Sequence, residues 1–396
     1  MVDGEPNESV TRESRHFWIL AWLAGAVAMF FVLSGGALLP GVDTYYHLKM
    51  ARLMPQLGFI HEFPWLHWTI FRDHFVSHHY GFHAILSPFV WVSDRLTGDL
   101  VMGGKVAVIA AMGTSAAVFY GLLRTLRIPQ ALSWTLLLGC LPWHFWLRMA
   151  YVRAPIVALP LLLLAVLVFL KERRALVWLV ACLFTSVYLG AVVAILVPFC
   201  FTAGHIIART TTRRTWMLLA LFLAGLACGL VFSPYFPENL PFLRIQIFAT
   251  GLGAEKDVPS EWRPFDAWTL ATMSAPLAAI WFGALILRLR RGEAMGATSL
   301  GLLLLNLSFL ALTLKARRFI EYWPVFALLN AADMARFTAA DVCLFVSGSR
   351  EWTRRAAVLL PLAAVFMAMP GLLLVRSHAR PGANHAAIRH AMAYLA

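Results

Sequence analysis

The chain has 396 residues, of which 60% are hydrophobic and only 13% are charged. Soluble domains carry roughly 25% charged residues, so this composition excludes a water-soluble fold. The mean hydropathy is +0.72, and the length leaves room for about ten spans of about 20 residues each. The formal net charge of +13 comes from short basic clusters between apolar runs, where Lys and Arg set membrane topology. We therefore expect a polytopic membrane protein and no nucleic-acid partner.

Runs with little or no charge are the candidate membrane spans. They cover residues 17–39, 101–123, 130–147, 154–170, 175–207, 216–232, 267–287, 297–314, 319–335 and 356–375. The run 175–207 is too long for one span and contains Tyr188-Leu189-Gly190 near its middle, which predicts a hairpin of two short helices. The piece 82–92 is too short to span and contains Pro88, so we expect an interfacial helix in the first outer loop. The expected fold is all-α, with about eleven transmembrane helices.

The distribution of Lys and Arg supports this count. With the N-terminus inside, every short basic cluster but one falls on the inner side, as the positive-inside rule requires. The exception is Lys315-Ala316-Arg317-Arg318, and a cluster that opposes the rule suggests a function. The outer side then holds two long segments, 40–100 and 233–266. We expect a transmembrane domain over 1–376, and residues 377–396 as the start of a C-terminal outer segment.

The first outer segment opens on Asp43-Thr44-Tyr45-Tyr46-His47-Leu48-Lys49. In a helix, Asp43 and His47 share one face at positions i and i+4, with Tyr46 beside them. A carboxylate at the membrane surface is a candidate general base or metal ligand. The alternative is that Asp43 is a plain helix N-cap after Pro40-Gly41.

Histidines are concentrated in the same segment, where seven of the thirteen in the chain lie between His47 and His83. The candidate site residues of this stretch are Asp73, His74, His78 and His79. Histidine with carboxylate and tyrosine suits metal ligation, proton transfer or hydrogen bonding to sugar hydroxyls. The alternative is that these side chains are amphipathic anchors at the membrane interface. No HExxH motif is present, which argues against a tight zinc site.

Basic residues gather at a second outer place. Arg317 and Arg318 stand beside Glu321 and Tyr322 at a helix entry, and the guanidinium fork binds phosphate, which at a bilayer surface belongs to a lipid head group. The alternative is that they are snorkelling anchors. Two further arginines, Arg148 and Arg153, bracket an outer turn and are expected to extend the same electropositive surface. The stretch 233–266 has the proline and aromatic content of an ordered lid and either contacts substrate or is plain loop structure.

These motifs resemble those of the GT-C superfamily of glycosyltransferases, in particular the catalytic subunit of oligosaccharyltransferase and its bacterial relatives. The resemblance rests on a DxxYH-like motif at 43–47, an aromatic and acidic stretch before a proline-containing helix at 71–88, and a late basic motif at 317–322. It implies transfer of a sugar from a polyprenyl-phosphate donor to a glycan, lipid or protein acceptor. The expected location is a bacterial inner membrane, with the active site facing the periplasm or the exterior.

The resemblance also implies roles for individual residues. Asp43, His47 and Asp73 are the expected catalytic residues, and Asp43 with Asp73 would hold a divalent cation, Mg²⁺ or Mn²⁺, if one is used. The expected substrate-binding residues are Tyr46, Lys49, His74, His78, His79, Arg148, Arg153, Arg317, Arg318, Glu321 and Tyr322. Two departures argue against protein N-glycosylation: the loop at 148–153 has no acid, and no WWD motif occurs.

Two other classes of function stay open. A lipid or lipid-linked sugar transporter or flippase would place ionisable residues or broken helices near mid-membrane and show internal repetition, whereas these spans are nearly free of charge and show no repeat. An assembly or scaffold subunit without catalysis would leave Asp43 dispensable.

Overall fold

The computed structural model describes residues 8–36, 39–41, 43–63, 67–69, 72–190, 192–245, 247–248, 260–336 and 371–376. All regular secondary structure in these residues is helical. The α-helices are α1 (Glu8–Leu33), α2 (Asp43–Leu57), α3 (Tyr80–Thr97), α4 (Leu100–Thr125), α5 (Ala131–Leu136), α6 (Trp143–Met149), α7 (Pro155–Leu170), α8 (Arg174–Val187), α9 (Val192–Ile207), α10 (Arg213–Val231), α11 (Asn239–Arg244), α12 (Ala267–Arg291), α13 (Ala297–Lys315) and α14 (Trp323–Ala335). Three short 3₁₀ helices are η2 (Leu137–Cys140), η4 (Ser260–Trp262) and η5 (Arg317–Glu321).

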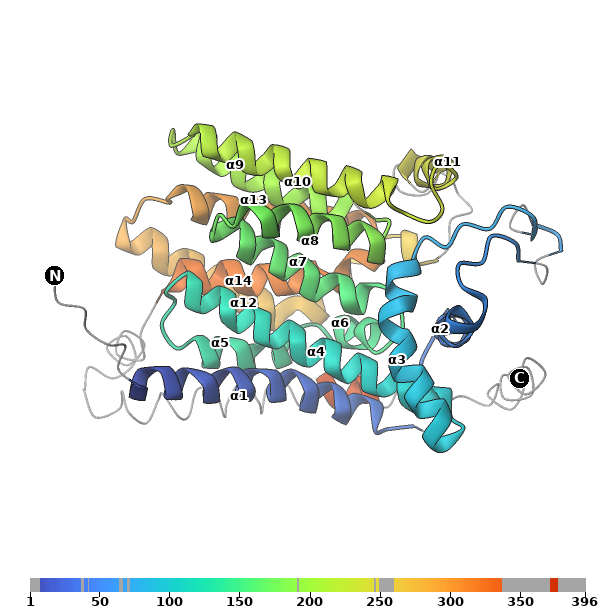
Figure 1. Cartoon of the computed structure of the whole chain (residues 1–396). Coiled ribbons are helices and arrows are strands. Elements are labelled where there is room, and N and C mark those ends of the chain that lie inside the picture. The colour runs from blue at the N-terminus through green and yellow to red at the C-terminus, as the bar shows by residue number, and fades with distance from the viewer. Residues whose placement is uncertain are drawn as a thin grey trace.

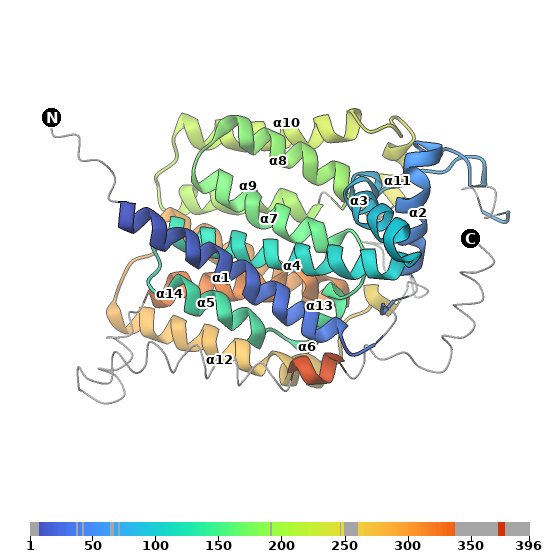
Figure 2. The same ribbon diagram turned by 60° about the horizontal axis from the view of Figure 1, so that its bottom comes forward.

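The long helices lie side by side in one bundle, and the chain reverses direction at each connection (Figures 1 and 2). Helices α2 and α3 lie across one end of this bundle, and the short helices α6 and α11 are at the same end. We call this the α2/α3 end. Helices that end at the opposite end of the bundle carry basic residues in their last turn, such as Arg124 in α4 and Arg288, Arg290 and Arg291 in α12.

Several helices have the length and composition of membrane spans. Among the described residues, five are long and apolar enough to cross a membrane: His16–Leu33, Leu100–Thr125, Arg213–Val231, Ala267–Arg291 and Ala297–Lys315. Four shorter apolar helices accompany them: Ala131–Cys140, Pro155–Leu170, Arg174–Val187 and Val193–Ile207. The chain is thus an all-helical protein of membrane type. The count of eleven spans and the interfacial placement of α2 and α3 stay predictions, and the run 356–375 lies outside the described residues except for 371–375.

Two of the apolar runs are divided in the structure. The run 175–207 forms two helices, since α8 ends at Val187 and α9 begins at Val192, which confirms the predicted division into two short helices. The run 130–147, expected as one span, is instead broken into α5, η2 and α6. The backbone is extended at Leu141 and Pro142, and proline has no N–H to continue a helix. The expectation of one continuous helix there was wrong, and the break places Arg148 near the C-terminal end of a short separate helix.

Small residues let helices approach closely where the site is built. In α10, a Cβ at Gly229 would meet the carbonyl oxygen of Cys182 in α8 at 2.5 Å, so only glycine permits this contact. At the start of α3, a Cβ on Gly81 would meet the carbonyl oxygen of Ser186 at 2.6 Å. The N-terminus of α3 is therefore held directly against the C-terminal end of α8, next to the hairpin turn.

Candidate functional site

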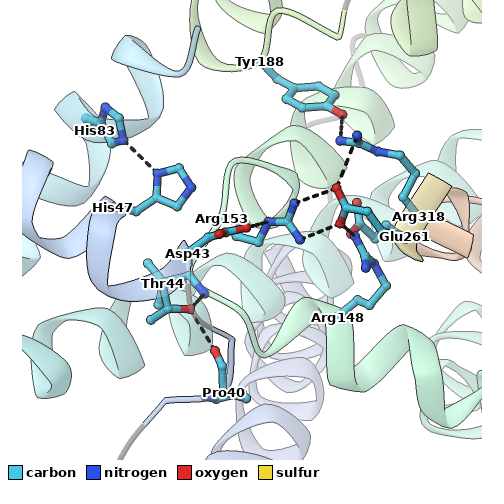
Figure 3. Close-up of polar contacts among 12 residues, drawn as sticks. Pro40, Asp43, Thr44, His47, His83, Arg148, Arg153, Tyr188, Glu261 and Arg318 are labelled. Carbon is cyan, nitrogen blue, oxygen red and sulfur yellow. Dashed lines mark hydrogen bonds and ion pairs between the residues drawn. The ribbon is translucent and has the colours of Figure 1, made fainter. Parts of the chain in front are cut away.

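Three arginines from separate segments of the chain meet around the carboxylate of Glu261 at the α2/α3 end (Figure 3). Arg153 Nη1 lies 3.0 Å from Glu261 Oε2, and Arg148 Nη2 lies 3.1 Å from the same oxygen. Arg318 Nη1 approaches Glu261 Oε1 at 3.6 Å. One carboxylate on η4 thus gathers guanidinium groups from α6, from the turn before α7, and from η5.

The arginines also have partners of their own. Arg148 Nε donates to Glu321 Oε1 at 2.5 Å, and the side chain of Glu321 is only 1% exposed. Arg318 donates to the hydroxyl of Tyr188 at 2.9 Å, and its guanidinium lies 4.2 Å from the centre of the Trp262 ring. Tyr188 is the first residue after α8, so the hairpin turn between α8 and α9 orients Arg318.

Asp43 is the first residue of α2, and its carboxylate faces this group of arginines (Figure 3). Its Oδ2 lies 3.7 Å from Arg153 Nε, and its side chain is 63% exposed. The neighbouring Thr44 hydroxyl donates to the carbonyl of Pro40 and accepts from the N–H of Val152. These two hydrogen bonds tie the start of α2 to the turn that carries Arg153, and they explain why Asp43 and Arg153 are close.

The histidines form a buried group between α2 and α3. His47 Nδ1 lies 2.9 Å from His83 Nε2, and the Ser77 hydroxyl lies 3.3 Å from His83 Nδ1. Two neighbours are stacked on aromatic rings, His78 on Phe242 and His79 on Tyr188. Burial lowers the pKa of His78 to about 4 and that of His83 to about 3, and it also lowers the pKa of His47 and His79. These imidazoles are therefore neutral at pH 7.

A pocket of about 270 Å³ opens beside the arginines. Its polar wall carries His78, His79, Arg153, Tyr188, Glu261, Lys315 and Arg318. The rest of the wall is mainly apolar and comes from the α8–α9 turn, α9, α13 and the segment around α11: Leu189, Gly190, Val193, Phe242, Leu243, Ile247, Trp262, Leu312 and Phe319. A charged wall facing an apolar one suits a ligand with an anionic head and a hydrocarbon chain.

The charges of this pocket are maintained at neutral pH. Burial raises the pKa of Glu261, but Arg318, Arg153 and Arg148 outweigh it and bring that pKa to about 2. Burial likewise opposes the charge on Arg153, and the carboxylates of Glu321 and Glu261 raise its pKa above the ordinary arginine value. Glu261 and Arg153 thus form a charged pair at neutral pH.

The structure brings together part of the residue set expected from the sequence. Asp43, Arg148, Arg153, Arg318 and Glu321 are joined by ion pairs directly or through Glu261. His78 and His79 line the same pocket. His47 is 5% exposed and engaged with His83, so it is not a pocket residue.

Other expected site residues lie elsewhere. Arg317 donates to the carbonyl of Pro264 and packs over Phe265. Asp73 is exposed beside Arg72, at 3.7 Å, and His74 is also exposed. Three more do not line the pocket: Tyr46 contacts the ring of His47, Lys49 is half-buried on α2, and Tyr322 is buried against Phe309.

Three residues at the centre of the site were not among the sequence candidates: Glu261, Trp262 and Tyr188. Glu261 lies in the second outer segment, whose sequence is compatible with both a substrate contact and plain loop structure. Glu261 could have been found by an electrostatic argument, because three basic residues gathered on the outer side need an acidic partner. The sequence marks Tyr188 only as part of the turn between the two short helices.

A metal site is not assembled in the described part of the chain. No group of three or more His, Cys, Asp and Glu side chains there could hold a metal ion. Asp43 faces a guanidinium, and Asp73 is paired with Arg72. These surroundings do not fit a cation site formed by two aspartates. Binding of a divalent cation stays a prediction.

Comparison with solved structures identifies the fold. The archaeal oligosaccharyltransferase AglB from Archaeoglobus fulgidus, in complex with an inhibitory peptide and a dolichol-phosphate, aligns with a TM-score of 0.65 and 13% identity over 93% of this chain and 57% of AglB. The apo form of the Archaeoglobus fulgidus oligosaccharyltransferase gives a TM-score of 0.64 at 11% identity, over 92% and 56% of the two chains. The form tethered to an acceptor peptide gives 0.60 at 12% identity, over 93% and 56%.

At this level of identity the likeness establishes the fold. The chain has the fold of the oligosaccharyltransferase AglB, as the resemblance predicts, and it covers little more than half the length of that enzyme. No protein-family model matches the sequence, and no curated protein matches it.

Proposed function

We propose that this protein is a membrane glycosyltransferase that takes a sugar from a polyprenyl-phosphate donor and transfers it to an acceptor hydroxyl on the extracytoplasmic side of the membrane. The observation that carries the proposal is the pocket in which Arg153 and Arg318 face an apolar wall, with Asp43 in contact with Arg153. The shared fold with AglB, which was solved with a dolichol-phosphate, supports the same reading.

The donor fits the two walls of the pocket. Guanidinium groups bind phosphate oxygens through charge-assisted hydrogen bonds, so the donor phosphate lies against Arg318 and Arg153. The polyprenyl chain then leaves along the apolar side chains of α9 and α13, such as Val193 and Leu312. This arrangement places the anomeric carbon, which is bonded to the phosphate, toward Asp43.

The transfer step needs a base and a stabilised leaving group. The acceptor oxygen forms a bond to the anomeric carbon while the bond from that carbon to the phosphate oxygen breaks. The proton of the acceptor hydroxyl passes to the carboxylate of Asp43. The bonding electron pair leaves with the polyprenyl phosphate, whose charge Arg318 and Arg153 stabilise. Because phosphate is already a good leaving group, no separate general acid is required.

The histidines act around this step without taking part in it. His78 and His79 are neutral and supply hydrogen-bonding groups in the wall of the pocket. His47 and His83 join α2 to α3 and so fix the helix that begins at Asp43. In this proposal they position the base.

The experiment is sugar transfer by the purified protein in nanodiscs, with a radiolabelled sugar on a short polyprenyl phosphate as donor. The acceptors to be offered are a polyprenol-linked glycan, a glycolipid and a peptide. Labelled product is expected with at least one of them, and an Arg318→Ala variant should form roughly 10- to 100-fold less of it when the donor is limiting. A protein that binds the donor and moves it across liposomes, but forms no product with any acceptor, would be a flippase and would contradict the proposal.

A further inference from the structure

The carboxylate of Glu261 occupies the centre of the arginine group. It lies within 3.1 Å of Arg148 and Arg153 and within 3.6 Å of Arg318. It also lines the pocket assigned above to the donor phosphate. A carboxylate and a phosphate use the same fork of guanidinium donors, so Glu261 is in the place where the phosphate oxygens would be bound.

The position of Glu261 matters because of the charges around it. The positive charges of Arg148, Arg153 and Arg318 are matched by three carboxylates, those of Glu261, Glu321 and Asp43. A phosphate added to this pocket, whose wall also carries Lys315, would meet the negative charge of Glu261 at close range. Two anions in a half-buried pocket repel each other strongly, because water screens them poorly there. One carboxylate must therefore leave when a phosphate enters.

Glu261 is the carboxylate that can leave. Glu321 is 1% exposed and is held by Arg148 below the pocket, whereas the side chain of Glu261 is 23% exposed. Glu261 is on the single 3₁₀ turn η4 (Ser260–Trp262), whereas Glu321 ends the longer 3₁₀ helix η5 and is separated from the buried helix α14 only by Tyr322. Asp43 approaches Arg153 at the Nε atom, where its Oδ2 lies at 3.7 Å. Release of Glu261 therefore disturbs the least structure.

We propose that Glu261 is an internal counter-anion that the donor phosphate exchanges for itself on Arg153 and Arg318. Resting on the proposed function, this exchange makes Glu261 a determinant of specificity. It keeps the three arginines paired and excludes weak anions, while the donor phosphodiester has two non-bridging oxygens, one for each of the pocket arginines Arg153 and Arg318. Glu261 thus lowers the affinity of the pocket for every anion and favours an anion that binds Arg153 and Arg318 together.

The test is the binding of a fluorescent polyprenyl monophosphate to the full chain in nanodiscs, with the matching polyprenol as the phosphate-free probe. The Glu261→Gln variant keeps the size of the side chain and removes its charge. We expect it to bind the phosphate lipid about 10-fold more tightly or better, because one charge-assisted contact no longer has to be broken. The polyprenol should bind both proteins equally. Glu172→Gln, which changes an acid paired with Arg214 at the opposite end, is the matched control.

Affinity that is unchanged or weaker in Glu261→Gln would overturn the exchange, since a residue that orders the arginines for the ligand would lose affinity when neutralised. Glu261→Ala provides a second neutral variant. In the wild-type protein, hydrogen exchange offers an independent measurement, because the N–H of Arg263 donates to the carbonyl of Ser260. Addition of the phosphate lipid should speed exchange in residues 260–263, and slower exchange would contradict the proposal.

Failure of this inference and failure of the proposed function are distinguishable. If no acceptor receives sugar but Glu261→Gln binds the phosphate lipid more tightly, the glycosyltransferase proposal fails and the exchange stands. If transfer occurs and depends on Arg318 but Glu261→Gln binds no more tightly, the exchange fails and the enzyme stands.

Discussion

The side chain of Arg153 connects Asp43 to Glu261. Its Nε lies 3.7 Å from Asp43 Oδ2, and its Nη1 lies 3.0 Å from Glu261 Oε2. One guanidinium therefore faces both the carboxylate that begins α2 and the carboxylate at the centre of the arginine group. The proposed base, Asp43, and the proposed phosphate site both contact Arg153. In this proposal, proton transfer and departure of the phosphate therefore occur on either side of one guanidinium group.

Substitution of Arg318 by Ala should weaken binding of the polyprenyl monophosphate. Each charge-assisted contact contributes about 1.5 to 3 kcal/mol, which corresponds to a loss of roughly 10- to 100-fold in affinity. Arg318→Lys should retain part of the affinity, because an ammonium is a point charge without the bidentate fork. The measurement is a titration with the fluorescent lipid.

The matched control for Arg318 is Arg214→Ala, since Arg214 is an exposed arginine paired with Glu172 at the opposite end of the bundle. It removes the same charge and should leave lipid affinity unchanged. Equal affinity of Arg318→Ala and the wild type would assign Arg318 to membrane anchoring.

Substitution of Arg148 by Ala should destabilise the fold. It leaves Glu321, 1% exposed, as a buried charge without its partner, and breaking a buried ion pair costs about 3 to 5 kcal/mol. The measurement is thermal unfolding of the protein in detergent. A second substitution, Glu321→Gln, should restore most of the loss, because it removes the unpaired charge. An Arg148→Ala protein as stable as the wild type would mean that Glu321 finds another partner.

The fold could be predicted from the sequence largely because it depends on local patterns. Apolar runs and the turn at Tyr188-Leu189-Gly190 predicted α8 and α9, which the structure confirms. Pro142 indicates the break before α6, but the prediction of one span over 130–147 followed the apolar composition of the run and not the proline. The site was harder to predict, because its centre depends on contacts between distant segments: Glu261 is 108 residues from Arg153 along the chain. The outer basic cluster predicted anion binding. No local pattern predicted that Glu261 pairs with these arginines, or that Arg318 and not Arg317 lines the pocket.

The α2/α3 end should face the exterior. Only that orientation places most basic clusters on the inner side. In a variant without native cysteines, Ser260→Cys should react with a membrane-impermeant maleimide in intact cells. The matched residue at the opposite end is Glu293, and Glu293→Cys should react only after the membrane is opened. The reverse pattern would invert the topology.

Stability should fall as the pH is lowered from about 6.5 toward 4. Burial lowers the pKa of His78 to about 4 and of His83 to about 3, so in this window the unfolded chain binds protons that the folded protein does not. Stability therefore rises with pH up to the ordinary histidine pKa and is fully present above it. The measurement is the unfolding temperature from pH 7 to 4 in detergent.

A variant with His78→Gln and His83→Gln should show a flatter dependence of unfolding temperature on pH. The change should approach about 1.4 kcal/mol per pH unit for each histidine removed. His67→Gln, which changes an exposed histidine of the same outer segment, is the control and should leave the profile unchanged. An equally steep profile after removal of both buried histidines would show that other groups take up the protons.

Substitution of Asp43 by Asn separates a catalytic role from a structural one. Asn begins helices nearly as well as Asp, and losing such a cap altogether costs about 1 kcal/mol, so a purely structural Asp43 predicts a normal protein. As the general base, its carboxylate cannot be replaced by an amide, and transfer should slow by about 10²- to 10⁴-fold. The matched control is Asp94→Asn, because Asp94 is also paired with an arginine, Arg52 at 3.0 Å, on the helices α2 and α3, but it does not line the pocket. Donor binding should be nearly unchanged in Asp43→Asn, since the residue contacts only the outer edge of Arg153. A folded Asp43→Asn protein with wild-type turnover would remove Asp43 from the mechanism, and the proton would then have to leave by another group of the site.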